Sequence, residues 1–322
     1  MYYTVSHVTR FRYSTPITES IMEVRIQPRS EGFQRCLDFR LHTNPRSLIM
    51  NYRGELGNRV HHFDVPNKHS QLTITAHAFV EVMAPPEIPE ALSPDAWQEL
   101  DEMTANDEHW DMLMPSRFAR PSELLYELTH ELGLQRRDDP LTVLHELNTA
   151  IREKFEYSQK NTQVDSPIDV ALSQRRGVCQ DFAHIMITLV RELKIPCRYV
   201  SGYLYHQSSA RDRSADDATH AWVEALLPGL GWVGFDPTNS SIAGERHIRV
   251  AIGRDYADVP PTRGVFRGKA ESELTVAVKV LPSEGPSFSN DLPIEDKWIV
   301  SPEENYEYDD RPTQQQPQQQ QQ

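Results

Sequence analysis

One stretch decides the fold of this chain: Arg176-Gly-Val-Cys179-Gln-Asp-Phe-Ala-His184. A glycine interrupts the chain just before the cysteine, and apolar residues then recur at helical spacing as far as Leu193. This pattern predicts a helix that begins at or near Cys179 and ends near residue 194. A thiol at a helix N-terminus lies among unpaired backbone N–H groups at the positive end of the helix dipole, which favours the thiolate. The stretch therefore fits a cysteine nucleophile, with a buried core cysteine as the alternative.

The composition indicates a large globular protein. The chain has 322 residues, of which 38% are hydrophobic and 25% charged, so it is longer than one average domain. Its net charge of −14, with no basic patch, argues against a nucleic-acid partner. There is no apolar run of about 18 residues and no signal-peptide pattern at the start, so we expect no membrane segment. The three cysteines have no framework spacing, which fits a reducing compartment, and we expect the cytoplasm.

Residues 1–83 have the pattern of a β-rich N-terminal domain. Alternating β-branched and aromatic residues, separated by proline, glycine and asparagine, fill the runs 3–13, 20–27, 37–43, 47–52, 58–65 and 72–82. Many short strands at such intervals predict an antiparallel sandwich or an open barrel. The histidines of this region are scattered, and the chain has no EF-hand pattern, so we expect neither a metal site nor a cofactor.

The remainder of the chain divides into four segments. Residues 84–121 predict a connector with short helices, and residues 122–242 predict a core in which helices precede an antiparallel sheet, an α+β arrangement. We expect 243–285 to be a C-terminal extension that packs on the core or on the N-terminal domain. The acidic and glutamine-rich tail, 286–322, has little apolar content to bury and is predicted to be disordered. We expect no catalytic or binding residue in it.

Two residues beyond Cys179 complete a possible catalytic group. Cysteine-based acyl transfer needs an imidazole that takes and returns a proton, and a group that orients the imidazole. His220 begins one predicted strand and Asp236 ends the next, and the turn around Gly229 makes the two strands a hairpin. His220 and Asp236 are then opposite or diagonal neighbours, although a slip of one residue would turn them to opposite faces.

The same segments resemble a known family, the transglutaminase-like superfamily. Four motifs carry the resemblance: Gly177-Val-Cys-Gln-Asp-Phe-Ala183, Pro196-x-Arg-Tyr-Val-Ser-Gly-Tyr203, His220-Ala-Trp-Val-Glu224 and Gly231-Trp-x-Gly-x-Asp-Pro-Thr-Asn239. The start of the chain, Tyr3-x-Val-x-His-x-Thr9, is similar to the β-rich domain that precedes the core in the bacterial branch. The resemblance covers about residues 1–280. It implies a papain-like core with Cys179 as nucleophile, His220 as general base and then acid, and Asp236 as the residue that orients His220.

Other residues of the expected site are less determined. The backbone N–H of Cys179 is the expected first oxyanion donor. For the second donor, Tyr157 and Gln180 both remain open, because this chain has no tryptophan between Trp110 and Cys179, where the cross-linking animal members carry one. Two further residues are candidates for substrate binding: Asp181 and Trp222. A first-turn carboxylate and a core tryptophan are the respective alternatives.

The leading functional hypothesis is cysteine-dependent hydrolysis of a peptide or isopeptide-type amide through an acyl-enzyme on Cys179. Acyl transfer from a glutamine carboxamide to an amine is the second hypothesis, and a non-catalytic protein-binding scaffold is the third. The expected partner is a peptide or protein amide substrate, with no nucleic acid and no membrane, and the oligomeric state is open. The pocket walls are expected from residues 160–166, the loop 207–218 and the N-terminal domain.

Overall fold

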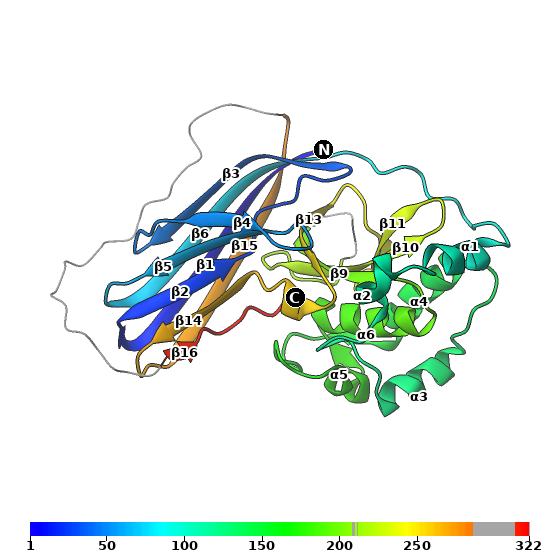
Figure 1. The fold of residues 1–322 in the computed structure, drawn as a ribbon. Coiled ribbons are helices and arrows are strands. Elements are labelled where there is room, and N and C mark those ends of the chain that lie inside the picture. Colours follow the sequence, from blue (N-terminus) through cyan, green and yellow to red (C-terminus); the bar gives the residue numbers. More distant parts are fainter. Residues whose placement is uncertain (208–209, 211, 286–312, 322) are drawn as a thin grey trace.

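The computed structural model describes residues 1–207, 210, 212–285 and 313–321. Two packed β-sheets form one end of the molecule, and a third sheet covered by helices forms the other (Figure 1). The α+β class, the β-sandwich at the N-terminal end and the core in which the cysteine helix packs on an antiparallel sheet agree with the sequence-based prediction.

The sandwich is built from strands of both ends of the chain. Its sheets have the strand orders β15-β1-β6-β3 and β16-β14-β2-β5-β4. The bounds are β1 (Tyr2–Ile17), β2 (Glu19–Val24), β3 (Gln34–Asn44), β4 (Met50–Arg53), β5 (Arg59–Val65), β6 (His69–Val82), β14 (Thr262–Arg267), β15 (Ser272–Ser283) and β16 (Thr313–Gln315). Side chains on alternate positions of the strands, among them Phe11, Phe63 and Leu72, are fully buried between the two sheets.

The core domain places its helices against a five-stranded sheet of order β12-β11-β10-β9-β13. The strands are β9 (Cys197–Leu204), β10 (His220–Leu227), β11 (Gly231–Asp236), β12 (Ser241–Ile242) and β13 (His247–Gly253), with a separate parallel pair, β7 (Glu156–Tyr157) and β8 (Arg176–Gly177). The helices are α1 (Ala96–Met103), α2 (Trp110–Leu113), α3 (Glu123–Leu132), α4 (Pro140–Lys154), α5 (Ile168–Gln174) and α6 (Cys179–Glu192), with short 3-10 turns at Asp107–His109 and Tyr256–Asp258. Helix α6 is buried from Cys179 to Arg191, so it is the central helix of the core.

The two domains share hydrophobic and polar contacts. Tyr3 and Val5 at the start of β1 belong to the hydrophobic cluster of the core domain, whereas Phe11 on the same strand packs inside the sandwich. The outer edge of β13 is paired with two carboxamides of the N-terminal domain. The Gln34 side chain bonds the N–H and C=O of Arg249 at 2.7 and 2.8 Å, and Asn58 does the same for Ile252 at 2.9 and 2.7 Å. The domains are therefore joined at the sheet that carries His220.

The C-terminal extension contributes to both domains. Strand β13 joins the core sheet, and β14 and β15 join the two sheets of the sandwich. The prediction of disorder for the tail is wrong for residues 313–321. Strand β16 pairs with β14, and Gln316, Gln319 and Gln321 are at most 5% exposed. Glutamine carboxamides can be buried when each finds hydrogen-bond partners, which a criterion of apolar content does not capture. The rest of the predicted tail, 286–312 and 322, lies outside the described residues.

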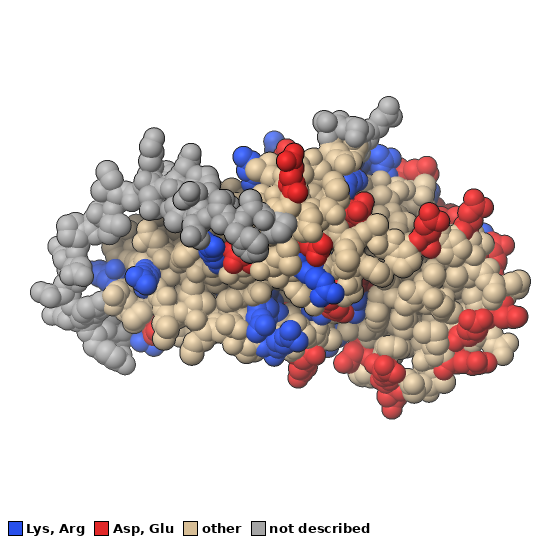
Figure 2. Space-filling model, turned by 90° about the horizontal axis from the view of Figure 1, so that it is seen from above, with Lys and Arg blue, Asp and Glu red and all other residues tan. Residues whose placement is uncertain are grey.

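Charge is unevenly distributed on the surface. Acidic side chains gather over the helical end of the face in Figure 2, and lysines and arginines lie over its middle and over the sandwich. Among the described residues, no helix has both the length and the apolar character needed to cross a bilayer.

Candidate active site

Cys179 is the first residue of α6. The carboxylate of Asp181, in the first turn of the helix, folds back onto the residue before Cys179. Asp181 accepts hydrogen bonds from the backbone N–H of Val178 at 2.9 Å and from the Thr162 hydroxyl at 2.6 Å. A Cβ at Gly177 would lie 2.7 Å from this carboxylate, so only glycine lets the side chain fold back. Burial raises the pKa of Asp181 to about 6, against the hydrogen bonds from Thr162 and Val178. Asp181 thus holds the start of α6 in place, and its hydrogen bonds are to Val178 and Thr162 of the protein itself.

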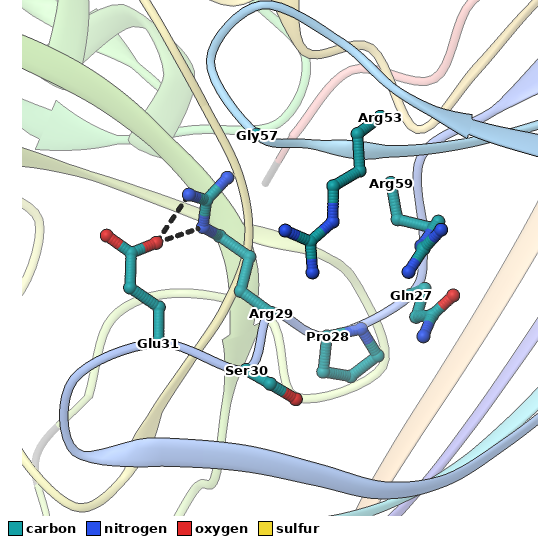
Figure 3. Close-up of a pocket in the computed structure, with 8 residues that line it drawn as sticks. All are labelled: Gln27, Pro28, Arg29, Ser30, Glu31, Arg53, Gly57 and Arg59. Carbon is teal, nitrogen blue, oxygen red and sulfur yellow. Dashed lines mark hydrogen bonds and ion pairs between the residues drawn. The ribbon is translucent and has the colours of Figure 1, made fainter.

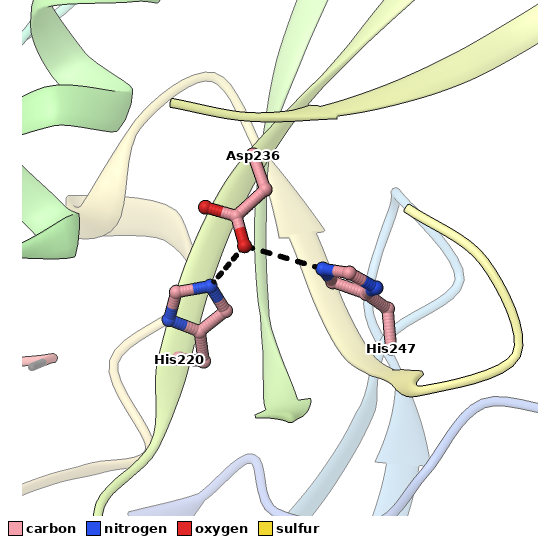
Figure 4. A group of neighbouring side chains, drawn as sticks. All are labelled: His220, Asp236 and His247. Carbon is pink, nitrogen blue, oxygen red and sulfur yellow. Dashed lines mark hydrogen bonds and ion pairs between the residues drawn. The ribbon is translucent and has the colours of Figure 1, made fainter. Parts of the chain in front are cut away.

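The hairpin β10–β11 brings His220 and Asp236 together. Val223 pairs with Phe235 and Leu227 with Gly231, a register centred on Gly229. Continued by one residue, this register places Asp236 opposite Trp222, so His220 is its diagonal neighbour on the same face. Nε2 of His220 lies 2.8 Å from Oδ2 of Asp236 (Figure 4).

The carboxylate of Asp236 is completely buried and fully hydrogen-bonded. Oδ1 accepts from the backbone N–H groups of Thr238 and Asn239 at 3.0 and 3.2 Å, and Oδ2 also accepts from the Asn239 side chain at 2.8 Å. Burial raises the pKa of Asp236, but the charge and hydrogen bond of His220, followed by those of His247, hold it well below the usual range. Asp236 is therefore a permanent negative charge next to His220.

His220 is bonded to one member of the predicted triad and lies near the other. Its Nε2 is hydrogen-bonded to Asp236, whereas its Nδ1 is buried and has no hydrogen-bond partner among the described residues. Burial lowers the pKa of His220, but the charges of Asp236 and Cys179 and the hydrogen bond to Asp236 raise it to about 10. The three residues thus form one buried group, in which the carboxylate is bonded to the imidazole and the Nδ1 of the imidazole is left for a proton.

The structure adds a second histidine, His247, that the sequence did not indicate. Its Nε2 lies 3.3 Å from Oδ2 of Asp236 (Figure 4). Its Nδ1 accepts from the backbone N–H of Gly244 at 3.3 Å. Because Nδ1 accepts, the proton of the neutral ring is on Nε2 and is donated to Asp236. Burial lowers the pKa of His247, against the hydrogen bond to Asp236, so the neutral form is favoured. No local pattern of the sequence indicates that the start of β13 lies beside Asp236.

The same three side chains have the composition of a metal site. One ligand atom each from His220, Asp236 and His247 lies within 4.8 Å of the others. A metal would need the lone pairs of both Nε2 atoms, yet in the hydrogen-bonded arrangement these atoms carry protons that they donate to Asp236. The group therefore fits a hydrogen-bonded triad better than a metal centre.

The other predicted site residues occupy different positions. Tyr157, on β7, has a raised pKa because of burial and then the charge of Cys179, so its hydroxyl is a neutral donor close to the thiol. The Gln180 carboxamide donates to the carbonyl of Val164 at 2.9 Å and accepts from the backbone N–H of Gln321 at 3.2 Å. Trp222 is fully buried, and its ring contacts those of His220 and His247. Trp222 therefore packs behind the histidines and is not on an accessible wall.

A hollow on the surface of the N-terminal domain is lined by none of the predicted site residues. It has a volume of about 270 Å³, and three arginines line it: Arg29, Arg53 and Arg59 (Figure 3). The guanidinium of Arg29 is paired with Glu31, and Arg59 donates to Asn51 at 2.9 Å. All of its lining residues lie between positions 27 and 59. This hollow is therefore separate in sequence from the Cys179 group.

Two parts of the chain match known protein families. Residues 129–237 match the transglutaminase-like superfamily, and residues 3–81 match the bacterial transglutaminase-like N-terminal region. The chain therefore belongs to the transglutaminase-like superfamily, in the group that carries this bacterial N-terminal region, as the sequence motifs predict.

Two similar proteins match most of the chain, and a third matches about a third of it. An uncharacterised protein of Mycobacterium leprae, ML0607, is 32% identical over 86% of this chain and 97% of its own length. The crystal structure of a candidate cysteine protease from Cytophaga hutchinsonii covers 90% of this chain and 94% of its own, with a TM-score of 0.68 and 22% identity, which establishes the shared fold. A protein-glutamine gamma-glutamyltransferase of Pseudomonas aeruginosa is 34% identical over 136 residues, which are 36% of this chain and 19% of that protein.

Proposed function

We propose that this protein hydrolyses a peptide or isopeptide-type amide through an acyl-enzyme on Cys179. The observation that carries the proposal is the His220–Asp236 hydrogen bond, which leaves the Nδ1 of His220 buried, near Cys179 and without a partner among the described residues. That is the arrangement in which an imidazole takes a proton from a thiol and later returns it.

The reaction follows from these contacts. The sulfur of Cys179 attacks the carbonyl carbon of the amide, and the electron pair of the C=O bond moves to oxygen. As the C–N bond breaks, protonated His220 gives its proton to the leaving nitrogen, and an amine or ammonia departs. Water then attacks the thioester and gives a proton to His220; the sulfur leaves, and the acid product is released. Asp236 keeps the imidazole oriented and stabilises its positive charge throughout.

We assign two groups to the stabilisation of the negative oxygen of the intermediate. The first is the backbone N–H of Cys179, at the start of α6, where helix N–H groups have no partner in the helix. The second is the Tyr157 hydroxyl, which is kept neutral by its raised pKa and lies near Cys179. Gln180 is less suited, because Val164 and Gln321 already bind its carboxamide.

A second candidate, acyl transfer from a glutamine carboxamide to an amine, is favoured by a specific contact. The carboxamide of Gln321 is bound by Tyr199, Ser201 and the carbonyl of His220, so groups next to the triad can hold a glutamine side chain. The glutamyltransferase relative of Pseudomonas aeruginosa supports the same chemistry for the core domain. The two candidates share the acyl-enzyme on Cys179 and differ in the amide that donates the acyl group and in whether water or an amine accepts it.

The experiment compares Cys179→Ala with Cys197→Ala in the full chain. Cys197 is a buried thiol that bonds the carbonyl of Ile187 at 3.4 Å, so it serves as the matched control. Turnover of peptide amides, and an acyl adduct located on the protein by mass spectrometry, should disappear in Cys179→Ala and persist in Cys197→Ala. Full activity in Cys179→Ala contradicts the proposal. Supplying a fluorescent primary amine and casein to the wild type distinguishes transfer from hydrolysis.

A further inference from the structure

The glutamine-rich segment of residues 313–321 runs from the sandwich to the active site. Strand β16 pairs with β14 at the edge of the sandwich, and the chain then passes, red in Figure 1, to the region between the sandwich and the core. The backbone N–H of Gln316 continues the contact with β14 by bonding the carbonyl of Gly264 at 2.8 Å. From Gln316 onward the segment forms neither helix nor strand and lies extended along the protein.

The Gln321 side chain ends next to the predicted triad and is 0% exposed. Its carboxamide oxygen accepts a hydrogen bond from the Tyr199 hydroxyl, and its nitrogen donates to the Ser201 hydroxyl and, at 3.4 Å, to the carbonyl of His220. The backbone N–H of Gln321 bonds the carboxamide of Gln180, the neighbour of Cys179, at 3.2 Å. Both ends of the carboxamide and the backbone are therefore recognised at once.

The residues before Gln321 are held in the same way. The Gln319 side chain donates to the Thr219 hydroxyl at 2.8 Å, and its backbone carbonyl accepts from the hydroxyl of Tyr256. Gln320 donates to Thr162, the residue that also bonds Asp181, at 3.0 Å. The segment thus bonds successive polar groups of the protein. These include Thr162, in the pocket wall predicted at residues 160–166, and Gln180, at the start of α6.

The hydroxyls that bind the glutamine segment are buried, and we call the space that the segment fills between them the groove. Four of them are on residues at most 2% exposed: Tyr199, Ser201, Thr219 and Tyr256. Among the hydrogen bonds between described residues, each of the four hydroxyls finds its partner in the glutamine segment. Leaving a buried hydroxyl unpaired costs about 1–3 kcal/mol, so an empty groove would have to admit water or another chain.

The active-site groups are inaccessible in this arrangement. Cys179 is 0% exposed and His220 is 1% exposed, although a nucleophile must be reached by its substrate. The covering chain belongs to the same molecule, and an intramolecular occupant competes at an effective concentration far above that of a dilute substrate. Residue Gln321 is bonded to the carbonyl of His220 and to Gln180, the neighbour of Cys179, so the segment lies against a site whose groups are buried.

We propose that residues 316–321 form an autoinhibitory strap, which occupies the substrate groove as an extended carboxamide chain and must leave before an external substrate binds. The inference rests on the proposed function, because it assigns regulation to the same site. The groups that bind the Gln321 carboxamide would bind the same group of another chain. The external ligand of this groove is therefore an extended polypeptide with a glutamine or asparagine side chain at the position of Gln321.

The test measures how fast iodoacetamide alkylates Cys179 in the full chain, with the modified residue identified by mass spectrometry. Gln321→Ala, and separately deletion of residues 316–322, should speed alkylation roughly tenfold or more, since each lost hydrogen bond weakens the closed form several-fold. Gln318→Ala is the matched control, because Gln318 forms no hydrogen bond among the described residues, and it should alkylate at the wild-type rate. Buried Cys197 must stay unmodified in every variant, which shows that the core is folded.

A synthetic peptide of residues 314–321, added to the deletion variant, should restore protection of Cys179. Equal alkylation rates in the wild type, Gln321→Ala and the deletion variant overturn the strap. Deamidation of Gln321 during incubation also overturns it, since the segment is then consumed as a substrate. Alkylation needs no turnover, so the two proposals fail separately. Faster alkylation without amide turnover refutes only the proposed hydrolysis, whereas turnover at equal alkylation rates refutes only the strap.

Discussion

His247 donates its Nε2 proton to Asp236, at 3.3 Å from the carboxylate oxygen that His220 also contacts. One buried carboxylate therefore orients two imidazoles that come from strands β10 and β13. The backbone N–H of Gly244 fixes the tautomer of His247, so this histidine remains a neutral donor while His220 carries the charge. His247 is thus a positioning residue that acts through Asp236.

Replacing His247 tests this role. His247→Phe removes a hydrogen bond to a buried charge, which contributes about 1.5–3 kcal/mol, so kcat should fall roughly 10- to 100-fold with little change in KM. His247→Gln keeps an N–H donor and should recover part of the loss. Steady-state kinetics of both variants provide the measurement, with thermal unfolding as a check on folding. Wild-type kcat in His247→Phe would leave no role for this contact.

The raised pKa of His220 predicts the alkaline limit of activity. The group has an ordinary value of 6.5 and a folded-state value of about 10, so the protonated imidazole persists to high pH. Its contribution to stability is fully present below pH 6.5 and is lost as the pH rises through about 10. We expect the alkaline limb of kcat near pH 10 in the wild type.

Asp236→Asn removes the largest influence that raises this pKa. The alkaline limb should then move to lower pH by about one unit or more. Asn239→Ala, which keeps the charge of Asp236 and removes one of its hydrogen-bond donors, should leave the alkaline limb closer to the wild-type pH. A limb at the same pH in wild type and Asp236→Asn contradicts the assignment of the titrating group to His220.

Gly177 permits the hydrogen bond that closes the start of α6. In Gly177→Ala the new Cβ would lie 2.7 Å from the Asp181 carboxylate, so that side chain must move and lose its bonds to Val178 and Thr162. We expect a loss of about 2 kcal/mol in the free energy of unfolding, measured with urea, together with reduced activity. Gly54→Ala, where the nearest atom is an ordinary 3.9 Å away, should change stability by less than about 0.5 kcal/mol. Equal stability of the two variants argues against a structural need for Gly177.

Asn58 joins the N-terminal domain to the core sheet. Asn58→Ala leaves the N–H and C=O of Ile252 on β13 without their partners, and a buried group left in this way costs about 1–3 kcal/mol. We expect the midpoint of urea unfolding to fall accordingly. Asn67→Ala, at an exposed position, should leave the midpoint unchanged. If both variants unfold like the wild type, the carboxamide is not what holds the domains together.

Much of the site could be predicted from local patterns. The helix at Cys179 was readable because its apolar spacing, the preceding glycine and the following proline all lie within about twenty residues of one another. The pairing of His220 with Asp236 was within reach because a tight turn sets the register of a hairpin. The choice between the two faces needed the observed register, since a shift of one residue inverts every side chain.

Other features were decided by contacts between distant segments. His247 reaches Asp236 only because β13 pairs with β9 across the sheet, and no local pattern specifies which strand will be that neighbour. The glutamine segment shows the same limit, since its composition alone indicates a solvated chain. Gln321 is buried because hydroxyls from β9, together with groups beside Cys179 and on His220, converge around its carboxamide. The sequence by itself determined the helix that carries the thiol and the hairpin that carries its base. Tertiary structure decided which second histidine binds Asp236 and which segment lies against the site, because both depend on hydrogen bonds that exist only after remote strands and segments have packed together.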